Sequence, residues 1–158
     1  MKIKFYLPVI LSLTGIISFS SLCFSEPPNP KLWEPLGYHS YYNKKIIRQS
    51  PDLPLVWTYK TITDEARAAR VAEVKAYDPE KSMTYQNYHH EAVLWEVDCR
   101  NQRLTMKEFI DFDKQGAVLD RYRYDKSQWE SIIPQSGGDR LYQNVCTTRK
   151  MPAKKKKK

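Results

Sequence analysis

The stretch SQWESIIPQSGGDRLYQNVC, Ser127 to Cys146, holds a Pro-, Ser- and Gly-rich turn followed by a helix-like segment that ends on a cysteine. Ser136 is a suitable helix N-cap, and Asp139 takes the third helical position, which is close to a capping box. Spacings of four residues predict that one apolar helix face carries four side chains, those of Leu141, Tyr142, Val145 and Cys146. This face is expected to meet a sheet.

The residues just before this helix are expected to leave that sheet. Trp129 and the pair Ile132-Ile133 are predicted to pack where the chain leaves the sheet, and Pro134 cannot continue a strand ladder.

Upstream, the period of the apolar residues changes to two, which is typical of strands. From Glu91 onward, Trp95, Val97 and Cys99 are expected to point to one face. After the polar turn CRNQR, a second strand is predicted in which Leu104, Met106, Ile110 and Phe112 alternate with Thr105, Lys107, Phe109 and Asp111, interrupted at Glu108. Gly116 in DKQG suits the positive φ of a hairpin turn before a third strand, Val118 to Tyr124. The three strands predict an antiparallel meander.

The first part of the domain predicts two further strands and a helix. Tyr38 to Ile47 and Leu55 to Ile62 are rich in aromatic and β-branched residues, and the turn QSPDLP separates them. Thr63 is a candidate N-cap for a helix that begins at Asp64 and ends near Asp78-Pro79. The fold class expected is α+β, with an antiparallel sheet of about five to six strands and a C-terminal helix.

The charge of this chain of 158 residues lies at its ends. The formal net charge is +8, yet 17 of the 26 basic residues and all 18 acidic ones fall between Glu26 and Thr148, a net charge of −1. With 158 residues, of which 41% are hydrophobic, the chain has the length and composition of one folded domain. A nearly neutral body argues against nucleic acid as a partner.

Residues 1–25 have the order of a secretory signal peptide: Lys2 and Lys4, the apolar run FYLPVILSLTGIISF, and the small-residue zone SSLCFS. Cleavage after Ser25 would start the mature chain at Glu26. An uncleaved anchor is the alternative, although the apolar run is shorter than the roughly 20 residues that span a bilayer. The other alternative is a lipoprotein acylated at Cys23, but Leu22 stands where a lipid-attachment box has a small residue.

Removal of that leader leaves two cysteines, Cys99 and Cys146, in an exported chain. An even number in an oxidising compartment predicts one structural disulfide. It would close a loop of 48 residues and stabilise the fold by about 4 kcal/mol on a chain-entropy estimate. The alternative is a reactive thiol, but neither cysteine has a histidine or basic cluster beside it in sequence that would lower its pKa.

The predicted organisation is a signal peptide at 1–25, a Pro-rich segment at 26–35, a domain at 36–148 and a basic tail at 149–158. The tail ends PAKKKKK, which has no apolar face to bury and is expected to be disordered. It is either a passive extension or a tether to anionic surfaces such as lipopolysaccharide, phospholipid headgroups or sulfated glycans.

The run from Tyr85 to Cys146 resembles the surface-adhesin protein E domain of Gram-negative bacteria. The features that carry the resemblance are the strand end VDC, the DKQG hairpin, a tryptophan before a Pro-x-Ser-Gly turn and the helix end LYQNVC. Upstream, YYNKKIIRQ and VWTYK occupy the places of the family's opening strands, so the resemblance extends over roughly Trp33 to Cys146.

The resemblance implies an antiparallel sheet with a disulfide-tied C-terminal helix, in agreement with the residue pattern. It also implies a surface protein that binds host matrix or plasma proteins such as vitronectin and laminin and that forms a homodimer. This chain departs from the family's named lipoprotein in lacking a lipid-attachment box and in having the helix at 64–77 and the lysine tail. The matching motifs build the fold, so no ligand-binding residue is transferred.

No enzyme, metal or cofactor is expected from the sequence. His89 and His90 are adjacent, so on a regular strand they would point to opposite faces, and His39 is about fifty residues away. The sequence has no zinc-type spacing, Gly-rich phosphate loop or GxSxG motif. The sequence therefore predicts an exported, non-enzymatic binding protein in the periplasm or at the outer-membrane surface. The alternative is an envelope protein with a structural or accessory role.

Overall fold

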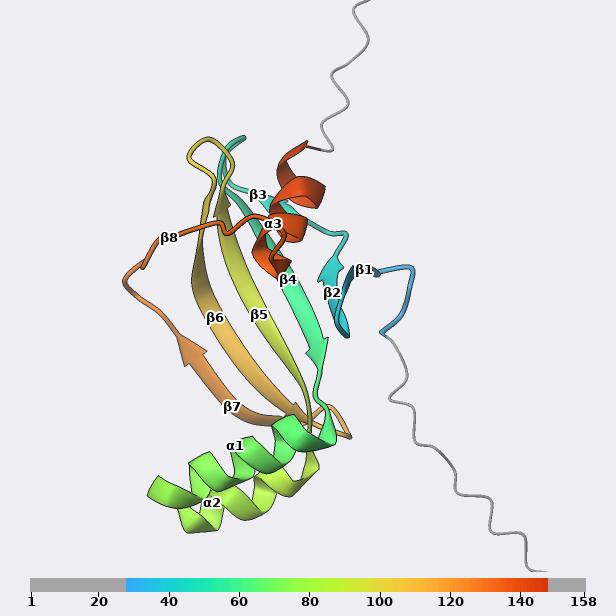
Figure 1. The fold of residues 1–158 in the computed structure, drawn as a ribbon, viewed down its shortest axis with the longest axis vertical. Helices are drawn as coiled ribbons and strands as arrows, with labels where there is room; N and C mark the ends of the chain where they lie inside the picture. Colours follow the sequence, from blue (N-terminus) through green and yellow to red (C-terminus); the bar gives the residue numbers. More distant parts are fainter. Residues whose placement is uncertain (1–27, 148–158) are drawn as a thin grey trace, which may run out of the picture.

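A strongly bent antiparallel sheet forms the centre of the computed structural model, which describes residues 28–147 (Figure 1). The predicted signal peptide at 1–25 and basic tail at 149–158 lie outside the described residues. The strands follow the order β1-β2-β4-β5-β6-β7, with β3 beside β4 and β8 beside β6. Their bounds are β1 Trp33–Gly37, β2 Ser40–Asn43, β3 Ile47–Arg48, β4 Pro54–Thr61, β5 Tyr88–Asp98, β6 Arg103–Asp113, β7 Val118–Arg123 and β8 Glu130–Ser131.

The helices form two groups at opposite ends of the sheet (Figure 1). The first group follows β4 in the chain and consists of α1, Asp64–Tyr77, α2, Pro79–Thr84, and a 3₁₀ turn, Tyr85–Asn87. The second is α3, Gly137–Tyr142, which continues as the π-helical turn Gln143–Thr147. The predicted fold class, an antiparallel sheet with a C-terminal helix, is confirmed.

The predicted meander is present as β5, β6 and β7. Each strand pairs antiparallel with the next. Gly116, in the β6–β7 turn, has φ 82°, a conformation that glycine adopts without steric cost. The hairpin prediction for DKQG is therefore confirmed.

The predicted starts of two helices are also correct. The Thr63 side chain accepts a hydrogen bond from the Ala66 N–H at the start of α1, and Ser136 accepts one from the Asp139 N–H at the start of α3. These caps satisfy backbone donors that have no partner inside the helix. Helix α2 was not predicted.

The predicted apolar face of the C-terminal helix packs on the sheet. Leu141 and Val145 are buried in one core cluster with Leu36, Val56 and Val97, and Tyr142 and Cys146 pack against the same cluster. The disulfide between Cys99 and Cys146 joins this helix to the end of β5, with the two Cα atoms 5.5 Å apart.

The first predicted strand, Tyr38 to Ile47, is wrong as a single element. Tyr38 and His39 have φ of 50° and 59° and form the turn between β1 and β2. Strand β2 ends at Asn43, and a separate short strand, β3, begins at Ile47. Strand β1 begins at Trp33, inside the segment 26–35 that was expected to precede the domain. The second predicted strand, Leu55 to Ile62, corresponds closely to β4.

The expected side-chain alternation in β6 is also wrong, because a β-bulge interrupts the strand. Leu94 pairs with Glu108 and Trp95 with Met106, which leaves Lys107 as an extra residue on β6. Leu104 and Met106 therefore face the side of Val97 and Trp95, whereas Ile110 and Phe112 face the opposite side.

This bulge lets both ends of β6 face the helices. Leu104 pairs with Val97 and Asp111 pairs with Glu91, and these two β5 residues share a face because six positions separate them. Leu104 approaches Gly138 of α3, and Asp111 bonds Tyr85 beside α2. Both helical groups therefore lie on one face of the sheet, which we call the helix face.

Candidate functional site

A groove with a volume of about 450 Å³ opens on the helix face beside α3. The sheet forms its floor, and its walls are the β1–β2 turn, the segment from β8 to α3, and α3 itself. Side chains from all these elements make it largely apolar, among them Leu36, Val93, Trp95, Leu104, Ile132 and Leu141. Its size lies within the roughly 300–1,000 Å³ that is typical of ligand pockets.

The polar side chains on the floor of the groove already have partners. The indole N–H of Trp95 donates to Thr58 Oγ1 at 3.0 Å, and Thr58 Oγ1 lies 3.4 Å from the Val93 carbonyl. Lys60 Nζ lies 3.7 Å from a carboxylate oxygen of Glu91. These polar side chains of the floor therefore have their partners within the protein.

Two large apolar side chains stand exposed at the rim. Tyr38 of the β1–β2 turn is 82% exposed, and Ile133, in the loop before α3, is 71% exposed. The prediction that Ile133 packs where the chain leaves the sheet is therefore wrong. Both side chains line the same groove, so they form one exposed apolar rim instead of isolated surface positions.

The backbone around this rim is strained. Tyr38, His39 and Gln135 have φ of 50°, 59° and 64°. These values are sterically unfavourable for residues other than glycine, and such residues tend to cluster at functional sites. They lie in the two loops that supply Tyr38 and Ile133.

Arg140 of α3 lies in the wall of the groove, next to the side chain of Tyr38. Its guanidinium carbon is 5.0 Å from the centre of the Tyr38 ring, in cation–π geometry. Its Nε atom is buried, and none of the described residues supplies a hydrogen-bond acceptor for it. Among residues 28–147, no carboxylate lies within ion-pair distance of Arg140. The groove therefore contains a cation without an acidic partner in the described chain.

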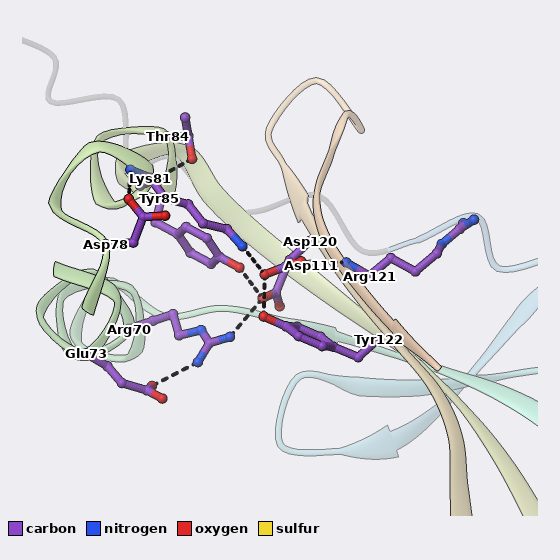
Figure 2. A network of polar contacts seen from close by, with 10 residues as sticks. All are labelled: Arg70, Glu73, Asp78, Lys81, Thr84, Tyr85, Asp111, Asp120, Arg121 and Tyr122. Carbon is purple, nitrogen blue, oxygen red and sulfur yellow. Dashed lines mark hydrogen bonds and ion pairs between the residues drawn. The ribbon is translucent and has the colours of Figure 1, made fainter. Parts of the chain in front are cut away.

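A second cluster of polar side chains joins α1 and α2 to the sheet (Figure 2). Asp111 is fully buried; one of its carboxylate oxygens accepts from the Tyr85 hydroxyl at 2.7 Å and lies 3.4 Å from Arg70. Lys81 pairs with Asp120, and Arg70 also pairs with Glu73. Burial and the bond to Asp111 raise the pKa of Tyr85 well above its usual value, which keeps the hydroxyl protonated. We interpret this cluster as structural.

The two cysteines predicted as the structural disulfide lie outside the groove. The bond fixes the C-terminal end of the helical segment, and the Tyr142 hydroxyl adds a contact to the Cys99 carbonyl at 3.4 Å. The disulfide thereby helps to hold α3, and with it Arg140, against the sheet.

The reasoning about His89 and His90 is corrected by a second β-bulge. Tyr88 pairs with Asp113 and His90 with Phe112, so His89 is the extra residue of β5. The two Nδ1 atoms consequently lie 3.2 Å apart instead of on opposite faces. No group of three metal-binding side chains forms within the part of the chain that the structure describes.

His90 is held in an aromatic stack on the sheet face opposite the helices. Its ring stacks on Tyr59 and on Phe112, at centre-to-centre distances of 4.6 Å and 4.7 Å. Burial, with a smaller effect from His89, lowers the pKa of His90 to about 4. This histidine is therefore neutral at physiological pH. The remaining histidine, His39, is exposed in the β1–β2 turn.

Sequence reasoning missed the residues that define the groove, chiefly Tyr38, Ile133 and Arg140. The one signal in the sequence for Tyr38 is the preceding glycine, Gly37. Gly37 has φ 89° and lies at the start of the β1–β2 turn. Nothing in the sequence brings Tyr38 next to Arg140, because about a hundred residues separate them.

An antiparallel sheet that carries a disulfide-tied helix and an open, largely apolar groove defines a small α+β domain with a candidate binding groove. The family model of surface-adhesin protein E matches residues 31–147, and the chain belongs to this family. Membership of this family implies that the protein is exported. The family is one of adhesins, and adhesins are not a class of enzymes. Within residues 28–147, no helix is both long and apolar enough to cross a membrane.

Solved structures of protein E from Haemophilus influenzae have a similar fold. The selenomethionine form has a TM-score of 0.50 and 13% identity, covering 78% of this chain and 92% of that one. Another structure of the same protein has a TM-score of 0.50 and 13% identity, covering 77% of this chain and 89% of that one. A search of curated proteins gives no significant match.

Proposed function

We propose that this protein is an adhesin that binds host extracellular-matrix or plasma proteins through the groove beside α3. The observation that carries the proposal is the exposed rim of Tyr38 and Ile133 around a largely apolar groove. Membership of a surface-adhesin family supports the same class of function.

The residue types at the groove are those that dominate protein–protein binding. Tyrosine, tryptophan and arginine are enriched among the residues that contribute most to interfaces, and Tyr38, Trp95 and Arg140 all line this groove. The groove is open at the surface and lies between loops, so it can admit a protruding segment of a folded partner.

The test is binding of the purified, exported protein to immobilised vitronectin and laminin by surface plasmon resonance. The variant Tyr38→Ser/Ile133→Ser removes both rim side chains, which are exposed and contribute little to the core. It should bind at least about tenfold more weakly, because the loss of interface anchors commonly costs 2 kcal/mol or more.

The matched control is Ile47→Ser, which removes an exposed isoleucine of β3 outside the groove. It should bind like the wild type. If the wild type binds neither host protein, or if the rim variant and the control bind equally well, the proposal fails.

Exposure of the protein at the cell surface is part of the proposal, and a periplasmic accessory role is the alternative. Protease treatment of intact cells distinguishes the two. Loss of the protein, while a periplasmic marker survives, supports the adhesin; full protection supports the alternative.

A further inference from the structure

We infer that the groove recognises an acidic–apolar peptide segment, in which Arg140 binds a carboxylate and the apolar lining takes the neighbouring bulky side chain. This inference rests on the proposed function and specifies the chemistry of the partner. The charges, the unsatisfied guanidinium and the shape of the groove each support it.

The charges of the groove favour an anion at one end. Lys60 already pairs with Glu91, whereas Arg140 has no acidic partner among residues 28–147. The nearest acid along α3, Asp139, accepts instead from the Gln135 N–H at 2.8 Å and from Gln143 at 3.3 Å. Arg140 is therefore the cation of the groove that a ligand can pair with.

The position of Glu130 gives the groove a direction. Glu130 lines the groove from β8, which pairs with β6, whereas Arg140 lies beside Gly37 and Tyr38 at the β1–β2 turn. An acidic group at the Glu130 end would be repelled, and one at the Arg140 end attracted. A bound segment should therefore place its carboxylate toward the β1–β2 turn.

Within residues 28–147, the buried Nε of Arg140 lacks a hydrogen-bond acceptor. Buried N–H groups are normally hydrogen-bonded, because an unpaired one has lost its hydrogen bonds to water without gaining a protein acceptor. In the part of the chain that the structure describes, the Nε of Arg140 has no acceptor, and Tyr38, whose ring lies near the guanidinium, is itself 82% exposed. Displacement of that ring loses little packing and opens the guanidinium to a carboxylate, which arginine binds through two parallel hydrogen bonds.

The lining next to Arg140 suits a bulky apolar side chain. Leu36, Trp95 and Leu141 line the groove, and they belong to or pack against the core cluster under α3. A rigid apolar surface beside one cation that has no acidic partner among residues 28–147 favours a ligand with both an apolar side chain and an acidic group. An acid alone or an apolar residue alone would use only half of the site.

The experiment is an NMR titration of ¹⁵N-labelled exported protein with three capped peptides. The first is acetyl-Gly-Asp-Leu-Phe-Gly-amide, the second has Asn in place of Asp, and the third has two Ser residues in place of Leu-Phe. The Asp-Leu-Phe peptide should bind about tenfold more tightly than each of the others, which corresponds to about 1.4 kcal/mol. The amide shifts should map to residues 36–41 and 130–141.

The charge variant Arg140→Gln should remove the preference for Asp over Asn, and Arg140→Lys should keep part of it. The control Arg121→Gln makes the same charge change at an arginine of β7 that pairs with Glu108. It should leave the tenfold preference unchanged. If Arg140→Gln fails to fold, the Arg140→Lys variant and the salt dependence of wild-type binding carry the test.

Equal binding of the Asp and Asn peptides by the wild type, absence of shifts at millimolar peptide, or a full preference retained in Arg140→Gln would each overturn the inference. Failure of the adhesin proposal is a separate result. A protein that prefers the acidic peptide but binds no host protein keeps the recognition and loses the adhesin role. A protein that binds vitronectin or laminin through the rim but does not prefer the acidic peptide keeps the adhesin role and loses the recognition.

Discussion

Among individual residues, Asp98 organises the turn that leads from β5 into β6. Its carboxylate accepts hydrogen bonds from the Asn101 side chain at 2.8 Å, the Asn101 N–H at 3.0 Å and Arg103 Nε at 2.9 Å. These bonds, led by the one from the Asn101 side chain, lower the pKa of Asp98 to about 2. The acid of the VDC motif thus fixes the turn next to Cys99.

This lowered pKa predicts a specific pH dependence of stability. A carboxylate with a pKa of about 2 in the folded protein, against 3.8 ordinarily, stabilises the fold above pH 4 by up to about 2 kcal/mol and loses this contribution as the pH falls toward 2. Urea unfolding of the wild type and of Asp98→Asn should therefore differ most near neutral pH. The difference should shrink on acidification; a constant difference would contradict the assignment.

Gly138 and Gly137 form a matched pair at the start of α3. A Cβ built on Gly138 would lie 2.9 Å from Leu104 Cδ2, whereas a Cβ on Gly137 has no neighbour within 4 Å. Alanine at 137 should gain helix propensity without a clash. Alanine at 138 should be less stable than alanine at 137 by about 1 kcal/mol, because buried Leu104 must move. Equal melting temperatures of the two variants would show that α3 packs less closely.

Among the helices and strands, the docking of α1 and α2 depends on the buried carboxylate of Asp111. The change Asp111→Asn removes the charge that binds Tyr85 and Arg70, and should destabilise the protein by about 2 kcal/mol in chemical denaturation. Asp52→Asn is the control, because Asp52 pairs with Arg100 at the exposed surface and such pairs contribute less than about 1 kcal/mol. Similar losses in both variants would mean that the cluster in Figure 2 does not anchor the helices.

The disulfide is expected to stabilise α3 on the sheet. The double change Cys99→Ser/Cys146→Ser should lower the free energy of unfolding by about 2–4 kcal/mol, since the bond closes a long loop of the unfolded chain. The far-ultraviolet circular dichroism of the sheet should persist. Peptide mapping without reductant should find the bonded pair in the wild type, and free thiols in exported protein would contradict the assignment.

The elements with local signals were predictable from sequence, and those that depend on strand pairing were not. The cap residues Thr63 and Ser136 correctly predicted the starts of α1 and α3. Asp78-Pro79 is a cap signal of the same kind, and it marks the start of α2. Strand β1 was missed because Pro35 made its segment resemble a linker. The bulges at Lys107 and His89 exist only in the register between two strands, so alternation in one strand did not reveal them.

For the whole molecule, the fold was predictable but the groove was not. The disulfide pair followed from the cysteine count and the apolar spacing. The groove, in contrast, joins the β1–β2 turn, the middle of the sheet and the segment before α3, and its key feature is that the buried Nε of Arg140 has no acceptor among residues 28–147. A polar group without a hydrogen-bond partner can be recognised only when the positions of all its neighbours are known.

The most direct test of the groove as the binding surface is hydrogen–deuterium exchange of the full exported protein, alone and with vitronectin or laminin. Binding in the groove predicts slower amide exchange in the β1–β2 turn and in residues 130–141, with β7 and the aromatic face around His90 unchanged. Slower exchange confined to β7 or to that aromatic face, with the groove segments unaffected, would contradict it.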